Sequence, residues 1–267
     1  MIRHSYLNRL LDQLRNPRSS DTSFIHHYPK FGNSLSDIFV GRGRHISTCF
    51  YGENPLALVL KEPIEVSHSI VMFDFNGQVL DCTRIESSEF TFQHCFESNI
   101  DEDFSFIHLT SYSREIERLF GDDLKRITRC HRGYTSYQLG HSGVESVVHG
   151  NYGCVYLDRR GRLVSLARQR SRHRYVLQEV LSPRFRYEFI FSNPTARSLD
   201  IEVLGFTDRL KTFEVSSATL PPFGSWIFRP SVQFADSFYS WCTRLPIGRC
   251  VVFEFDDEHA ACNVFHS

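Results

Sequence analysis

Residues 71–80 read Val-Met-Phe-Asp-Phe-Asn-Gly-Gln-Val-Leu, and residues 155–164 read Val-Tyr-Leu-Asp-Arg-Arg-Gly-Arg-Leu-Val. Both stretches place a Gly three residues after an Asp. The correspondence continues downstream, where Phe104-Ser105-Phe106-Ile107 matches Tyr187-Glu188-Phe189-Ile190. The offset of about 84 residues is longer than the roughly 20–50 residues of solenoid repeats. This recurrence therefore predicts two diverged copies of a small domain.

The residues around the first stretch have the alternation of half-buried strands. Ile70 to Asp74 is predicted to be a strand, and the return strand starts at Val79. Asn76-Gly77 between them suits a type I′ hairpin turn, which needs positive φ at both central residues. The chain has 24 Phe and 11 Tyr but only 2 Met, and aromatic residues pack well on pleated surfaces. Many short strands with frequent turns indicate a sandwich or barrel.

The predicted fold is all-β, with two tandem, diverged β-sandwich-like domains, an N-terminal helix and a short linking helix. Residues 1–36 form the helix and a linker, residues 37–127 the first β domain, and residues 128–267 the second. The linking helix is expected over residues 113–127, with Ser113 as its cap. The N-terminal helix has a leucine face flanked by arginines. We expect it to dock on the protein's own core, and a transit peptide or a membrane-surface helix is the alternative.

Charge, hydrophobicity and cysteine content bear on the partners and the cellular compartment of the protein. The net charge is −1, which gives no general attraction to nucleic acid or membranes. No apolar run reaches the 18 residues of a transmembrane helix. The chain has eight Cys but no CxxC pair and no secretory signal core, so we expect reduced thiols in a cytoplasmic protein.

Arginines give the leading indication of function. Arg168, Arg170, Arg172 and Arg174 occupy every second position, so in an extended segment they share one face. A guanidinium binds carboxylate, sulfate or phosphate with two hydrogen bonds at once. The predicted ligand site comprises these four arginines together with Arg186 and Tyr152. The expected partner is an anionic carbohydrate or the acidic surface of another protein.

Two structural interpretations compete with this ligand face. Glu86 and Glu89 occupy the equivalent part of the first copy, so the two copies could pair these charges. The arginines could also be a solvated strand edge that discourages aggregation. Nucleic acid is disfavoured as a partner, because the sequence has no helix–turn–helix, zinc-finger or RNP pattern.

A Cys/His group between the copies gives the alternative function. His131, His141, His149 and Cys154 lie close together in sequence, and imidazole and thiolate bind zinc or iron. Their spacing matches no short metal motif. The alternative is therefore a metal-dependent, hydrolase-like enzyme with zinc or iron at these four residues.

Aromatic residues in the same region could stack on sugars. Tyr134, Tyr137 and Tyr152 lie in a segment expected to be a loop near His141. The leading prediction is a non-catalytic binding or accessory β-sandwich protein without a cofactor. A purely structural role, with the arginines neutralised at the interface of the copies, is the third hypothesis.

Overall fold

The computed structural model describes residues 33–43, 46–96, 100–121, 123–124, 133–139, 144–150, 155–156, 173–179, 181–194, 198–207, 212–231, 238–243, 249–256 and 261–266. The described part is built mostly from antiparallel strands, with two short helices, α2 (Pro55–Leu60) and α3 (Arg114–Phe120). The N-terminal strands are β1 (Asn33–Gly41), β2 (Ile46–Glu53), β3 (Val66–Phe73), β4 (Val79–Ser87), β5 (Thr91–Cys95), β6 (Phe104–Ser111), β7 (Tyr134–Leu139), β8 (Val144–His149) and β9 (Val155–Tyr156). The C-terminal strands are β10 (His173–Val176), β11 (Arg186–Ser192), β12 (Leu199–Phe206), β13 (Thr212–Leu220), β14 (Ser225–Phe228), β15 (Phe238–Thr243), β16 (Val251–Phe255) and β17 (Ala261–His266).

These strands form four sheets. Sheet I has the order β4-β3-β6-β1-β9, and sheet II has the order β5-β2-β7-β8. Sheet III has the order β14-β11-β16-β17, and sheet IV has the order β10-β15-β12-β13. Sheets I and II make the first sandwich, and sheets III and IV make the second. The predicted all-β, sandwich-like fold is confirmed.

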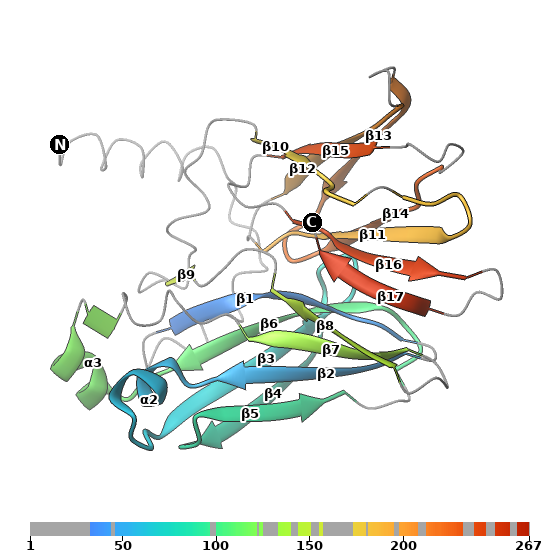
Figure 1. Ribbon diagram of the computed structural model, residues 1–267. Coiled ribbons are helices and arrows are strands. Elements are labelled where there is room, and N and C mark those ends of the chain that lie inside the picture. Colours follow the sequence, from blue (N-terminus) through green and yellow to red (C-terminus); the bar gives the residue numbers. More distant parts are fainter. Residues whose placement is uncertain are drawn as a thin grey trace, which may run out of the picture.

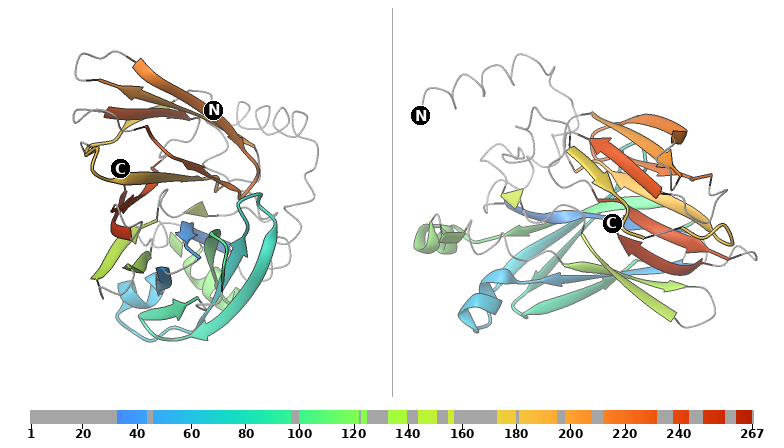
Figure 2. Two further views of the ribbon diagram at one scale, coloured as in Figure 1. Left: turned by 90° about the vertical axis from the view of Figure 1, so that its right-hand side faces the viewer. Right: turned by 45° about the horizontal axis from the view of Figure 1, so that its top comes forward.

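The two sandwiches are stacked on each other (Figure 1), and both views in Figure 2 show the orange and red second sandwich on one side of the first. Sheet III is buried on both faces. Phe189 and Phe191 of β11 face the core shared with sheet IV. Ile190 between them packs against a second core that includes Val40 of β1 and Val148 of β8. The junction between the sandwiches is therefore a hydrophobic core in its own right.

The interior of the first sandwich is aromatic. Phe39 and Phe106 of sheet I stack with ring centroids 5.2 Å apart, and Phe50 of sheet II packs against Phe39 at 4.7 Å. All three side chains are buried. Edge and face contacts between aromatic rings are favourable beyond the area that they bury. This packing holds β2 of sheet II against the centre of sheet I.

The hairpin between β3 and β4 forms where the sequence predicts it, but with a different turn. Gly77 has a φ of 82°, whereas Asn76 is not among the residues with positive φ. The Gly77 N–H donates to the Asp74 carbonyl, and the Asp74 carboxylate accepts from the main-chain N–H of Asn76 and Gln78. This is a type I turn followed by a left-handed glycine. The predicted type I′ turn is wrong, because the Asp74 side chain stabilises the longer, three-residue loop.

The start of the predicted linking helix is confirmed. Ser113 caps α3 as expected, with its hydroxyl accepting from the Ile116 N–H, and α3 ends at Phe120. Residues 123–124 are helical as well, and residues 122 and 125–127 of the predicted span lie outside the described residues. Val155 and Tyr156, which the sequence repeat aligns with Val71 and Met72 of β3, pair with β1 of sheet I. Strands β7 to β9 all belong to the sheets of the first sandwich. Shared sheets thus extend past residue 127, the predicted end of the first domain.

The predicted N-terminal helix lies outside the described residues, which start at Asn33. Residues 33–36, predicted to be the end of the linker, belong to strand β1. Among the described residues, neither helix has the length and apolar character needed to cross a membrane.

Candidate functional site

The exposed face of sheet II carries a row of polar and aromatic side chains. Tyr51 of β2 lies opposite Gln93 of β5 on one side and opposite Tyr134 of β7 on the other. Tyr134 in turn lies opposite His149 of β8. Gln93 and His149 are exposed, and both tyrosines are partly exposed. Antiparallel register therefore brings together four side chains that are distant in sequence.

The rings in this row are ordered by contacts with one another. The Tyr51 and Tyr134 rings are nearly parallel, with centroids 5.0 Å apart and an interplanar angle of 16°. The Gln93 Nε2 donates to the Tyr51 hydroxyl at 3.1 Å. The His149 ring lies 5.9 Å from the ring of His266 on β17, in the second sandwich, where β17 lies beside β8 (Figure 1). We call Gln93, Tyr51, Tyr134, His149 and His266 the polar aromatic row.

A glycine before β7 allows the two tyrosines to meet. Gly133 has a φ of 65°, which side-chain-bearing residues rarely adopt. A Cβ at this position would lie 2.8 Å from the Phe50 ring and 2.9 Å from the Tyr51 carbonyl oxygen. The chain can therefore approach β2 closely and enter β7 with Tyr134 next to Tyr51.

A disulfide holds edge strand β5 in the same face. Cys49 of β2 lies directly opposite Cys95 of β5, and the two form a disulfide. Gln93 also donates to the Cys95 sulfur at 3.2 Å. The expectation of reduced thiols is wrong for this pair, because the strand register places the two sulfurs together. The cross-link keeps Gln93 in the polar aromatic row.

Behind sheet II, two buried histidines face the strands that carry the row. His68 of β3 and His108 of β6 hydrogen bond to each other, with 3.0 Å between Nδ1 of His68 and Nε2 of His108. The Phe92 ring of β5 covers both imidazoles, at 4.3 Å and 5.4 Å. Burial lowers the pKa of His68 to about 4, although the carboxylate of Glu86 raises it. Burial also lowers the pKa of His108 well below its ordinary value, so both imidazoles are neutral at pH 7.

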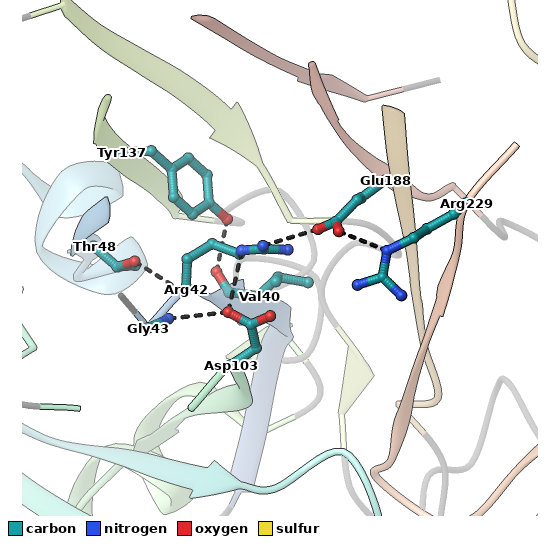
Figure 3. Close-up of polar contacts among 8 residues, drawn as sticks. All are labelled: Val40, Arg42, Gly43, Thr48, Asp103, Tyr137, Glu188 and Arg229. Atoms are coloured by element: carbon teal, nitrogen blue, oxygen red, sulfur yellow. Dashed lines mark hydrogen bonds and ion pairs between the residues drawn. The ribbon is translucent and has the colours of Figure 1, made fainter. Parts of the chain in front are cut away.

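An ion-pair network fixes the junction between the sandwiches (Figure 3). The Arg42 guanidinium, which follows β1, contacts Asp103 at 3.2 Å and donates to Glu188 of β11 at 2.9 Å. The other oxygen of Glu188 accepts from Arg229 at 2.9 Å. The Arg42 guanidinium also lies over the ring of Phe253, 4.6 Å from its centroid. Burial raises the pKa of the Asp103 carboxyl, and the positive charge of Arg42 lowers it.

This network matters for the polar aromatic row because the row crosses the same junction. The Arg42 side chain is 10% exposed and the Glu188 side chain 11%. Removing one partner of a buried ion pair leaves a charge that is costly to bury. The network therefore resists sliding of one sandwich over the other, which keeps His266 next to His149.

The predicted arginine face is described only in part. Arg168, Arg170, Arg172 and Tyr152 lie outside the described residues. Arg174 is exposed on β10, an edge strand of sheet IV, opposite Cys242 of β15. Arg186 is exposed on β11, and its guanidinium lies over the ring of Phe255 at 5.4 Å. The arginine-lined ligand site stays a prediction, and its two described members belong to different sheets.

Glu86, one of the two acids that could pair with these arginines, has a different partner. Glu86 pairs with Arg84 of its own strand at 2.6 Å. The pKa of Arg174 is raised mainly by a hydrogen bond to Cys242, with a contribution from Glu202. The described arginines of the predicted face, Arg174 and Arg186, therefore do not pair with Glu86 of the first half.

Of the predicted metal ligands, the structure describes only His149. His131, His141 and Cys154 lie outside the described residues. Within the described ranges, no group of three or more His, Cys, Asp or Glu side chains is gathered as a metal site. The zinc or iron site at these four residues remains a prediction.

Sequence reasoning found part of the row and missed the rest. Tyr134, one of three tyrosines that could stack on a sugar, belongs to the row, although it lies on a strand rather than in the predicted loop. Tyr137 is another of the three, but its side chain is fully buried and its hydroxyl donates to the Val40 carbonyl. Gln93, Tyr51 and His266 were missed. The alternation of buried and exposed residues along β2 would have placed Tyr51 on the outer face, but nothing local shows that Tyr134 lies beside it.

Comparisons with known proteins give weak matches only. No family model and no curated protein matches the chain. A glycoside hydrolase family 2 β-galacturonidase from Eisenbergiella tayi, bound to glycerol, has 11% identity and a TM-score of 0.22, over 89% of this chain and 35% of that one. A glycoside hydrolase family 2 β-glucuronidase has 9% identity and a TM-score of 0.19, over 89% of this chain and 24% of that one.

A third solved structure, a β-D-mannosidase from Dictyoglomus thermophilum, has 10% identity and a TM-score of 0.17, over 95% of this chain and 31% of that one. The chain thus spans 24% to 35% of the length of these three enzymes. All three weak neighbours act on carbohydrates by their names. At such TM-scores the likeness carries no argument about the site.

Proposed function

We propose that this chain is a non-catalytic, carbohydrate-binding accessory protein whose ligand lies on the exposed face of sheet II. The observation that supports this proposal is the polar aromatic row. A sugar ring has apolar C–H surfaces edged by hydroxyl groups. Tyrosine offers a matching combination, because its ring is apolar and its hydroxyl donates and accepts hydrogen bonds.

The groups that flank the tyrosines suit the same ligand. Gln93 has an amide that can both donate and accept, and His149 has an imidazole that can do the same when neutral. Both are exposed. Rigid aromatic residues lose little conformational entropy on binding, and the stack of Tyr51 on Tyr134 fixes both rings before a ligand arrives. The row thus combines preorganised apolar surface with adaptable hydrogen-bonding groups.

A second candidate keeps the predicted arginine face. Arg174 is exposed on the extended edge strand β10, as that prediction requires. On this hypothesis β10 and the arginines before it bind an anionic carbohydrate or an acidic protein surface. Salt-sensitive retention on a sulfated resin that Arg174→Ser weakens would support it. Retention that this substitution leaves unchanged would count against it.

The disulfide bears on the cellular compartment of the protein. The sequence predicted the cytoplasm, but disulfides persist mainly in oxidising compartments. The pair Cys49–Cys95 therefore favours an oxidising compartment. Thiol labelling of the protein taken from its own cell, with the labelled positions mapped by mass spectrometry, would distinguish the two compartments. Cys49 and Cys95 would react only if reduced, whereas the exposed thiol of Cys82 should react in either case.

The test of the proposed function is binding to a glycan array by the full chain and by two variants. Tyr134→Ala removes an anchor of the row, and Val215→Ala is the matched control, because Val215 is 66% exposed on β13 of sheet IV. We expect Tyr134→Ala to weaken binding about tenfold, which corresponds to about 1.4 kcal/mol. The control should bind as the parent does. Absence of binding to every glycan on the array would refute the proposal, and equal binding by Tyr134→Ala would move the site elsewhere.

A further inference from the structure

The charge of sheet II bears on which carbohydrate it would bind. Its four strands contain no Lys or Arg, although the chain has 30 such residues. The charged residues in these strands are Glu53 of β2 and Glu145 of β8. Glu53 lies two residues from Tyr51 along β2, so it shares the outer face. Glu145 is exposed on β8, on the same side as His149. The described strands of sheet II thus present two carboxylates and no Lys or Arg to a ligand that carries a carboxylate or sulfate.

The length of the row bears on the size of the ligand. Gln93, Tyr51, Tyr134 and His149 lie on four adjacent strands, and three spacings of about 4.8 Å cover roughly 14 Å. The ring of His266 lies a further 5.9 Å from that of His149. A row this long exceeds one sugar ring. It also runs across the strands in one direction, as an extended chain would.

The end of the row comes from the other sandwich. His266 lies on β17 of sheet III, whereas the other four side chains belong to sheet II. A ligand that reaches from Tyr51 to His266 therefore contacts both sandwiches. A ligand no longer than the stacked tyrosines contacts only the first.

Resting on the proposed function, we propose that the ligand is a neutral glycan chain that lies across the strands of sheet II and reaches His266 of the second sandwich. The acidic residues on the face disfavour anionic chains by repulsion. Additional sugar residues gain contacts until the chain covers the row. Because the bound chain touches both sandwiches, it also stabilises the junction between them.

The experiment uses the full chain and measures Kd by calorimetry. The probes are cello-, xylo- and manno-oligosaccharides of two, four and six residues, with hexagalacturonate as the anionic chain of matched length. For at least one neutral series, affinity should rise about tenfold from the disaccharide to the tetrasaccharide or hexasaccharide. Hexagalacturonate should bind about tenfold more weakly than the best neutral hexasaccharide.

Two variants locate the chain on the row. His266→Ala should weaken binding of the best hexasaccharide several-fold and leave the disaccharide unchanged, whereas Tyr134→Ala should weaken both. The control Val215→Ala should change neither. The melting temperature of each variant without ligand shows whether it is folded as the parent is.

The remaining outcomes separate this inference from the proposed function. Equal affinity for short and long neutral chains, an unaltered hexasaccharide affinity in His266→Ala, or tighter binding of hexagalacturonate at the Tyr134 site would overturn the inference while the carbohydrate site stands. Binding on the glycan array by acidic or single sugars alone would do the same. If no glycan binds on the array or in solution, the proposed function fails and this inference fails with it.

Discussion

Replacing Glu188 by Ala should destabilise the protein by about 3 kcal/mol, because breaking a buried ion pair costs about 3–5 kcal/mol. The Arg42 side chain is 10% exposed and that of Glu188 is 11% exposed, so the lost partner leaves a buried guanidinium. Asp103 still lies 3.2 Å from Arg42 and offsets part of this cost, which places the expectation at the lower end of the range. Arg229, whose side chain is 66% exposed, adds little, since exposed ion pairs contribute about 0–1 kcal/mol.

The matched control for this prediction is Arg229→Ala, which removes the other partner of the same carboxylate. It should cost less than about 1 kcal/mol. Urea unfolding followed by tryptophan fluorescence and by circular dichroism gives both free energies. In the double variant Arg42→Met with Glu188→Leu, apolar groups replace the pair, so it should be more stable than Glu188→Ala alone. If Glu188→Ala costs no more than Arg229→Ala, the argument that burial makes this pair important is refuted.

The buried histidine pair makes stability depend on pH. The pKa of His68 is about 4 in the folded protein, against 6.5 for the unfolded chain. The contribution of neutral His68 to the free energy of unfolding is therefore complete above pH 6.5 and is lost as the pH falls towards 4. Within this window His68→Phe should reduce the slope of unfolding free energy against pH by about 1.4 kcal/mol per pH unit, and an unaltered slope would contradict the assignment. Replacing Cys49 and Cys95 by Ser should cost about 2–4 kcal/mol, because the cross-link closes a separation of 46 residues in the unfolded chain; the melting temperature of the parent protein should fall to that of the variant on reduction, and no fall would count against the cross-link. Gly77→Ala should cost about 2–3 kcal/mol, because φ is 82° and the new Cβ would lie 2.0 Å from a main-chain oxygen across the junction. Gly121→Ala, also at positive φ but with open space around the Cβ, should cost about 1 kcal/mol, and thermal unfolding that ranks the two variants the other way would show that the junction contact is unimportant.

Several elements of the fold could be predicted because their causes are local. The hairpin at Asn76-Gly77 has its turn residues and both its strands within one short segment. The cap at Ser113 depends on a hydroxyl and an N–H three residues on. The predicted type of hairpin turn was wrong at this site, because the carboxylate of Asp74 accepts from the N–H groups of Asn76 and Gln78. Nearby residues decided each of these features, so a pattern in one segment was informative.

The candidate site could be predicted only in fragments. Tyr134 was recognised as a residue that could meet a sugar, but its neighbour Tyr51 is 83 positions earlier (134 − 51) and reaches it through the register of β2 with β7. Tyr137 illustrates the same difficulty from the other side. It has the same side chain as Tyr134 three residues away, yet it faces the interior and is fully buried. Strand alternation separates their two roles, and the predicted loop hid that alternation.

That this chain is built from strands is evident from its sequence, because aromatic residues in period-two patterns and frequent turn residues act within a few positions of one another. The sequence does not show that β7 to β9 pair with strands of the first sandwich or that Arg42 contacts Glu188. Such pairings depend on which strand edges meet and which faces become buried. These choices come from burial summed over four sheets, and no single segment contains that sum.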